Sequence, residues 1–177
     1  MTSWMLEGDG SRIHREAYEK LGVVGIPCGI QGAKGGGWFR TELNSVADFK
    51  GQRVILYFYP ADDTPGCTRE ACQFNDNLAH FQAAGVPVIG ISRDDAQSHQ
   101  RFRNKYGLQF PLLTDADHQV MDAYGAWGEK TRYGQTSIGV LRSTFLVDEQ
   151  GHIERAWHNV KADGHATQVL EALVPKV

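Results

Sequence analysis

The feature that most constrains the fold of this chain is an apolar run that ends at a proline. Residues 54–59 read Val-Ile-Leu-Tyr-Phe-Tyr and are followed by Pro60. The run is rich in β-branched and aromatic residues and does not alternate with polar ones, which is typical of a strand covered on both faces. The sequence therefore predicts a strand that is buried between other elements.

Further helices and strands are expected after this strand. Ala71, Phe74, Leu78 and Phe81 follow helical periodicity and predict one helix of about 15 to 18 residues that ends near Gly85. Asp94-Asp95 can cap another helix, which is expected to end at Gly107. Two short helices are expected at residues 118–124 and 166–173. Strands are expected at residues 86–92, 110–113, 144–147 and 152–157. Strands that alternate with helices, followed by a late hairpin, indicate an α/β fold with a central mixed sheet flanked by helices.

Length and composition fit one domain. The chain has 177 residues, of which 41% are hydrophobic and 22% charged, and neither an internal repeat nor a linker divides it. The net charge of −3 leaves no basic excess for a nucleic acid. The longest apolar run is far shorter than the roughly 20 residues that span a bilayer, and the first residues do not resemble a signal peptide. We therefore expect a cytoplasmic protein that binds neither nucleic acids nor membranes.

The cysteine count directs attention to thiol chemistry. Three cysteines are too few for a disulfide scaffold, and the odd number leaves at least one without an internal partner. No histidine lies near a cysteine at a zinc-ligand spacing. The glycines at positions 35–37 do not complete a dinucleotide fingerprint, because Arg40 stands where its last glycine should be. We therefore expect neither a metal nor a bound cofactor.

Cys67 lies where a nucleophile would be activated. It follows the buried strand and a polar turn, in or just before the first turn of the predicted helix. Unpaired backbone N–H groups and the positive end of the helix dipole meet there, and both favour a thiolate. Thr64, three residues earlier, can direct a hydroxyl at the space above the sulfur, while Pro60 and Pro65 stiffen the turn.

Cys72 follows five residues later in the same predicted helix. Positions five apart in an intact helix have Cα atoms about 8–9 Å apart, whereas a disulfide generally needs less than about 7 Å. A bond between Cys67 and Cys72 would therefore require the first turns of the helix to unwind. The alternative is that both cysteines are small buried hydrophobic residues without chemical activity.

Residues 57–72 resemble the active-site block of the peroxiredoxins. Pro60, Thr64 and Cys67 match the family signature P-x-x-x-T-x-x-C, and a second cysteine at position 72 is typical of the bacterioferritin comigratory protein, or peroxiredoxin Q, subfamily. Three further blocks agree in order and spacing: residues 113–118, 124–130 and 141–148. The likeness runs from Asp48 to the C-terminus, so we expect a single domain over residues 1–177 with a divergent segment at 1–47.

This resemblance implies a thioredoxin-like fold and thiol-dependent reduction of hydroperoxides. It assigns Cys67 as the peroxidatic nucleophile, Cys72 as the resolving thiol that forms an intramolecular disulfide, Thr64 as a peroxide-binding hydroxyl and Arg142 as a guanidinium near the sulfur. Arginine suits that role because its donors stay charged at any working pH. The family also implies recycling by thioredoxin or a similar dithiol, and the subfamily implies a monomer.

Several alternatives remain open at the level of the sequence. Glu70 could hydrogen-bond to Arg142, or it could simply stabilise the helix dipole. Cys28 lies in the divergent segment and is either a bystander thiol or a cysteine that acts as a second resolving thiol or forms an intermolecular bridge. The same fold could also carry a thiol–disulfide oxidoreductase, although the C-x-x-C motif of thioredoxins is absent, or a non-catalytic binding module.

Overall fold

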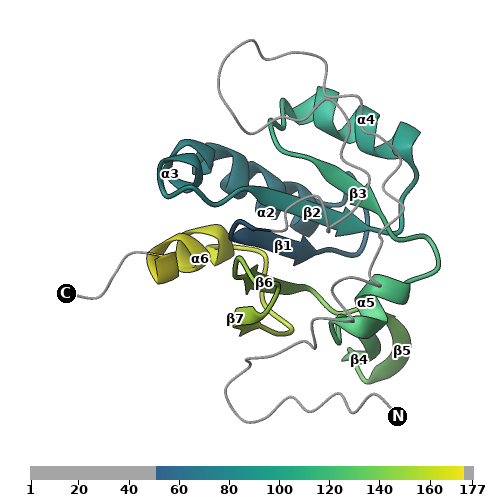
Figure 1. Cartoon of the computed structure of the whole chain (residues 1–177). Helices are drawn as coiled ribbons and strands as arrows, with labels where there is room; N and C mark the ends of the chain where they lie inside the picture. Colours follow the sequence, from purple (N-terminus) through teal and green to yellow (C-terminus); the bar gives the residue numbers. More distant parts are fainter. Residues whose placement is uncertain (1–50, 174–177) are drawn as a thin grey trace.

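The computed structural model describes residues 51–173, which form a five-stranded sheet with helices packed against it (Figure 1). The strand order is β3-β2-β1-β6-β7. Strands β1, β2 and β3 are parallel, whereas β6 runs antiparallel to both of its neighbours. The strands span Val54–Phe58 (β1), Val88–Ser92 (β2), Leu112–Thr114 (β3), Ser143–Val147 (β6) and Ile153–Trp157 (β7). The predicted mixed sheet is thus confirmed.

Strand β1 lies in the middle of this sheet and is buried on both sides, as its sequence predicts. Val54, Leu56 and Phe58 belong to a cluster on one face, and Ile55 and Tyr57 belong to a second cluster on the other; all five are 0% exposed. The first cluster includes residues of helix α5 (Gln119–Ala123). The second includes residues of α2 (Pro65–Asp76), α3 (Leu78–Ala83), α4 (Ala96–Tyr106) and α6 (His165–Leu173).

The ends of α4 follow the predicted signals. Asp95 is the N-cap, and its side chain accepts a hydrogen bond from the backbone N–H of Ser98. Gly107 ends the helix in the left-handed region with φ of 65°. The helix predicted at residues 94–107 is therefore confirmed, and the other predicted elements are confirmed with small shifts at their ends, apart from the long helix after Cys67.

That long helix is divided in two at Asn77. The backbone of Asn77 has φ of −95° and ψ of 3°, and its side-chain Nδ2 donates to the carbonyl oxygen of Gln73 at 2.8 Å. Asparagine side chains compete in this way with the backbone bonds of a helix. The prediction of one continuous helix is wrong at this residue, although the apolar face continues from α2 into α3.

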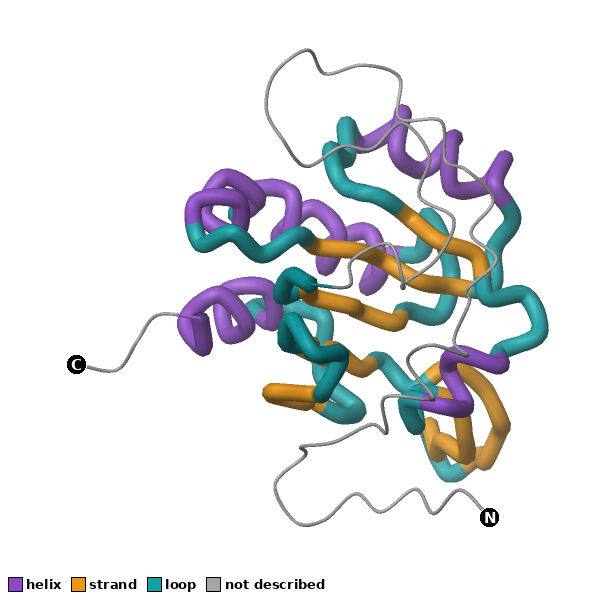
Figure 2. Tube along the Cα trace, viewed as in Figure 1, coloured by secondary structure: helices purple, strands orange, loops and turns teal. Residues whose placement is uncertain are grey.

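A β-hairpin beside α5 was not predicted. Strands β4 (Trp127–Arg132) and β5 (Gln135–Val140) pair antiparallel and lie outside the main sheet (Figure 2). The turn between them uses Tyr133 and Gly134, which both have positive φ, as favoured two-residue hairpin turns require. Most residues of the hairpin are exposed, so its sequence lacks the apolar pattern from which a strand is recognised.

No helix among residues 51–173 is long and apolar enough to cross a membrane. The divergent segment at residues 1–47 and its Cys28 lie outside the described residues.

Candidate active site

The site lies where β1 leads into α2. A short loop follows β1, and Pro65 opens the helix with its fixed φ in the first helical position. Thr64 is the N-cap in an extended conformation, and its carbonyl accepts the backbone N–H of Thr68 at 2.8 Å. Cys67 is consequently the third residue of the helix and lies in its first turn, as the sequence predicts.

Arg142 meets Cys67 at this point. Its Nη2 donates to Cys67 Sγ at 3.3 Å, although the two residues are 75 apart in sequence. The contact follows from the topology, because Ser143 at the start of β6 pairs with Phe58 at the end of β1. The sulfur is buried, with Cys67 only 2% exposed, so the Arg142 guanidinium contacts it in a site with little access to solvent.

Gly66 leaves room for this contact. A Cβ atom at position 66 would approach Arg142 Nη2 to 3.3 Å, which is tighter than ordinary packing. Glycine here allows the guanidinium to reach the first turn of α2 without displacement.

Glu70 shares the same guanidinium. Its Oε2 accepts a hydrogen bond from Arg142 Nη1, and its side chain is fully buried. Burial raises the pKa of Glu70 to about 7, against the opposing effect of the Arg142 charge. Among the described residues its Oε1 has no hydrogen-bond partner. The contact with Arg142 favours the first of the two sequence-based explanations for Glu70, which was not among the predicted site residues.

Thr64 is half-buried and its hydroxyl is tied into the turn. Oγ1 donates to the carbonyl oxygen of Ala61 at 2.9 Å. With its proton committed, the hydroxyl oxygen keeps lone pairs that can accept the O–H of a bound hydroperoxide.

Cys72 lies on the same helix and is half-buried. Burial raises the pKa of the Cys72 thiol, and the charge of Asp76 raises it further. Cys67 and Cys72 are both free thiols, and α2 is helical from one to the other. This geometry keeps the Cα atoms about 8–9 Å apart, so a disulfide between them needs local unwinding.

The loop before Thr64 is anchored by a buried polar network that was not predicted. Asp62 accepts hydrogen bonds from the Tyr59 hydroxyl at 2.6 Å and the Ser98 hydroxyl at 2.8 Å. His99 Nδ1 lies 2.8 Å from Asp62 Oδ2, and the two side chains are 0% and 3% exposed. The other ring nitrogen of His99 lies 3.1 Å from the carbonyl oxygen of Leu113. A carbonyl oxygen only accepts, so the His99 ring donates to it through Nε2.

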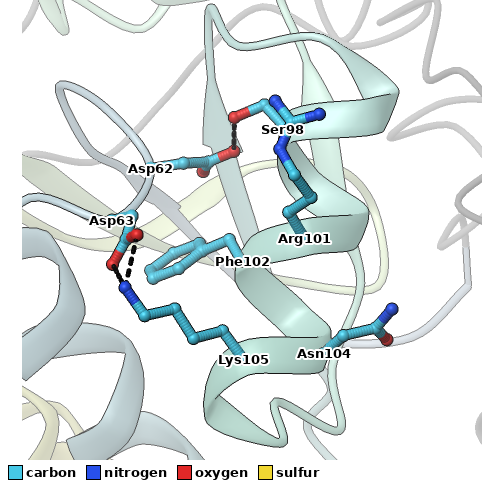
Figure 3. Close-up of a pocket in the computed structure, with 7 residues that line it drawn as sticks. All are labelled: Asp62, Asp63, Ser98, Arg101, Phe102, Asn104 and Lys105. Atoms are coloured by element: carbon cyan, nitrogen blue, oxygen red, sulfur yellow. Dashed lines mark hydrogen bonds and ion pairs between the residues drawn. The ribbon is translucent and has the colours of Figure 1, made fainter.

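A pocket of about 550 Å³ borders this loop (Figure 3). In Figure 3, Asp62 points to Ser98 and Asp63 points to Lys105, with the ring of Phe102 between them. Lys105 Nζ lies 2.7 Å from an Asp63 oxygen. The lining residues come from the loop and α4, and neither Cys67 nor Arg142 is among them. The pocket is therefore separate from the surroundings of the sulfur.

Comparisons with known proteins identify the family. The model of the AhpC/TSA family matches residues 39–156. Peroxiredoxin Bcp of Escherichia coli (strain K12) is 46% identical over 132 residues, which cover 75% of this chain and 85% of the relative. The chain belongs to the peroxiredoxins of the AhpC/TSA family. The resemblance predicted from residues 57–72 and the three later blocks is confirmed, and the family match begins at residue 39, inside the segment that we expected to diverge.

Solved structures agree with this assignment. The peroxiredoxin is similar to the bacterioferritin comigratory protein of Xanthomonas campestris, with 42% identity, a TM-score of 0.69, and coverage of 73% of this chain and 83% of that one. Peroxiredoxin Q of Xylella fastidiosa gives a TM-score of 0.70 at 41% identity, with coverage of 75% and 82%. The thioredoxin-like fold is thus confirmed. Like its family, the protein is a thiol-dependent peroxidase that takes peroxide substrates and a thioredoxin-like reductant.

Proposed function

We propose that Cys67 is the peroxidatic nucleophile of this peroxidase. The observation that carries the proposal is the hydrogen bond of 3.3 Å from Arg142 Nη2 to Cys67 Sγ in the first turn of α2. The thiolate attacks the terminal oxygen of a hydroperoxide, a bond forms between sulfur and that oxygen, and the O–O bond breaks. The departing oxygen takes up a proton and leaves as an alcohol or water, and Cys67 becomes a sulfenic acid.

Arg142 and Thr64 assist this displacement. Negative charge moves from the sulfur to the departing oxygen. The positive charge of the Arg142 guanidinium, whose Nη2 donates to Cys67 Sγ, stabilises that charge at the sulfur and at the oxygen. The Thr64 hydroxyl, which is fixed on Ala61, accepts the O–H of the peroxide and orients the O–O bond toward the sulfur. Glu70 holds the guanidinium in place through the other terminal nitrogen, Nη1.

Cys72 is the resolving thiol in this proposal. Its sulfur attacks the sulfenic sulfur of Cys67, the S–O bond breaks, and water leaves as the intramolecular disulfide forms. A thioredoxin-like dithiol then reduces the disulfide by exchange. A raised pKa suits Cys72, because it stays a thiol while Cys67 reacts with the peroxide.

The oligomeric state and the compartment follow from this cycle. Both cysteines lie on one helix, so no thiol of a second subunit is needed, and we infer a monomer. The cycle needs a dithiol reductant, and we infer a reducing compartment such as the cytoplasm. We further infer that residues 1–177 form one domain that binds neither nucleic acids nor membranes.

Mass spectrometry of a resolving-cysteine variant tests the proposal. After one equivalent of hydrogen peroxide, Cys72→Ser should gain one oxygen on Cys67, as a sulfenic acid that a dimedone probe captures. Wild-type protein should instead lose two hydrogens in a Cys67–Cys72 disulfide. Oxidation of Cys72 while Cys67 stays a free thiol would contradict the assignment.

A further inference from the structure

After Cys72, side-chain amides of α2 form hydrogen bonds to other parts of the protein. Gln73 Nε2 donates to Asp163 Oδ1 at 2.8 Å, and Gln73 Oε1 accepts the backbone N–H of Gly164 at 2.9 Å. Both partners belong to the segment just before α6, about 90 residues away in sequence. One amide group thus bridges α2 to the start of α6 with two hydrogen bonds.

The side-chain amide of Asn75 also makes two hydrogen bonds, to the segment that follows α4. Its Oδ1 accepts the backbone N–H of Gln109 at 2.8 Å, and its Nδ2 donates to the carbonyl of Gly107 at 3.3 Å. Residues two apart in a helix point about 200° apart, so Gln73 and Asn75 reach opposite sides. Between them, Phe74 is 0% exposed and stacks on Tyr57 with ring centroids 4.6 Å apart.

The turns before Gln73 make fewer side-chain hydrogen bonds to the rest of the protein. The side-chain hydrogen bonds that residues 65–72 make to the rest of the described chain all go to one residue, Arg142. Arg69 is exposed, and the hydroxyl of Thr68 is buried with no hydrogen-bond partner within the described region. Unwinding residues 65–71 releases the two Arg142 contacts and exposes Cys67 and Ala71, which are 2% and 1% exposed in the helix. Unwinding all of α2 would also release the four amide hydrogen bonds and withdraw Phe74 from the core.

We propose that Gln73 and Asn75 form an amide clamp that keeps Cys72 in place throughout the redox cycle, so that residues 65–71 unwind and Cys67 is the cysteine that moves. This inference rests on the proposed Cys67–Cys72 disulfide. In that step the sulfenic acid of Cys67 and the thiol of Cys72 give one disulfide and one water. The clamp makes Gln73 and Asn75 positioning residues for the resolving thiol.

The clamp has a thermodynamic consequence. A contact that is equally strong in two states cancels from the equilibrium between them, whereas one that is lost in one state shifts it. If the clamp persists, removing it lowers the stability of both redox forms alike and leaves the disulfide equilibrium unchanged. A change that weakens the helix within residues 65–71 penalises only the dithiol form and therefore favours the disulfide.

Disulfide equilibria of matched variants test whether unwinding is confined to residues 65–71 and stops before Gln73. Each full-length protein, in a Cys28→Ser background, is equilibrated with reduced and oxidised dithiothreitol, and the disulfide fraction is measured by alkylation and mass spectrometry. Glycine destabilises a helix interior relative to alanine, so Arg69→Gly should favour the disulfide about fivefold over Arg69→Ala. Ala79→Gly, at an exposed position of α3, should leave the equilibrium within about twofold of its parent. Gln73→Ala and Asn75→Ala should behave like Ala79→Gly while lowering the unfolding midpoint.

Two results would overturn the inference. One is that Gln73→Ala or Asn75→Ala favours the disulfide as strongly as Arg69→Gly, which would mean that the clamp opens on oxidation. The other is that Arg69→Gly and Arg69→Ala have equal equilibria, which would mean that residues 65–71 do not unwind. If the wild-type protein forms no Cys67–Cys72 disulfide with peroxide, the proposed function fails instead, and this is seen before any clamp variant is made.

Hydrogen exchange of the wild-type protein gives an answer that does not depend on the folding of a variant. The backbone N–H groups of Gly164 and Gln109 are bonded to the clamp side chains. Their exchange rates should be the same in the dithiol and disulfide forms if the clamp persists. If oxidation accelerates the exchange of both N–H groups by the same factor as the exchange of the backbone N–H groups of residues 67–71, the clamp is released on oxidation.

Discussion

Arg142 Nη2 lies 3.3 Å from Cys67 Sγ, while the other terminal nitrogen of the same guanidinium is bonded to Glu70. The sulfur and the carboxyl group are both buried, so each depends on this one cation for compensation. The reactivity of Cys67 and the ionisation of Glu70 are coupled through Arg142.

Replacing Arg142 should slow the first chemical step. Lysine keeps the charge but cannot present two parallel N–H groups to Cys67 and Glu70. We expect Arg142→Lys to lower kcat/KM for hydrogen peroxide by about a hundredfold, the scale found when one preorganised donor is removed. Stopped-flow measurement of Cys67 oxidation checks this. Arg69→Ala, a change at an exposed arginine on the same helix, is the matched control and should react at the wild-type rate.

The raised pKa of Glu70 predicts a pH dependence of the peroxide reaction. Burial raises this pKa to about 7. Below it the carboxyl is neutral and the Arg142 charge acts on the sulfur alone, whereas above it the carboxylate competes for that charge. The rate profile of the wild-type protein should therefore contain an inflection near pH 7 that is absent from Glu70→Gln. Identical profiles for the two proteins would show that Glu70 does not titrate in this range.

The same ionisation should affect folding stability. A carboxyl group whose pKa is raised in the folded state binds more protons there than in the unfolded chain. Its contribution is present below the usual glutamate pKa and is lost as the pH rises through about 7. The free energy of unfolding of wild type relative to Glu70→Gln should therefore be greater at about pH 5 than at about pH 8, as measured by urea titration. A difference that grows with pH would have the wrong sign.

Removing His99 should destabilise the loop that leads to Thr64. His99→Ala leaves the buried Asp62 side chain without its imidazole partner, and breaking such a pair typically costs about 3 kcal/mol. Urea unfolding measures this loss. Lys105→Ala, which removes the exposed partner of the adjacent Asp63, is the control and should change stability far less. Equal effects of the two substitutions would mean that burial of the pair has no special importance.

The sequence anticipated the parts of this site that are local. The run at residues 54–59, Pro65 and the apolar spacing after it placed Cys67 in the first turn of a helix, and the structure agrees. The proximity of Arg142 came only from the family resemblance, because no local pattern connects residues 75 apart. The same limit applies to His99 and Asp62, which form a buried pair from different elements.

The errors in the fold also have local causes. The helix prediction relied on apolar periodicity, which continues through Asn77, while the break depends on a side-chain amide that bonds to the carbonyl of Gln73. The hairpin of β4 and β5 carries little buried surface, so only Gly134 in its turn offered a signal.

Peroxide turnover by Cys67→Ser, compared with wild type and Cys72→Ser, tests most directly the central claim that Cys67 is the nucleophile. Consumption of hydrogen peroxide is followed with thioredoxin, thioredoxin reductase and NADPH for wild type, Cys67→Ser and Cys72→Ser. The account predicts steady turnover for wild type, none above background for Cys67→Ser, and a single turnover without efficient recycling for Cys72→Ser. Steady turnover by a folded Cys67→Ser protein would contradict it.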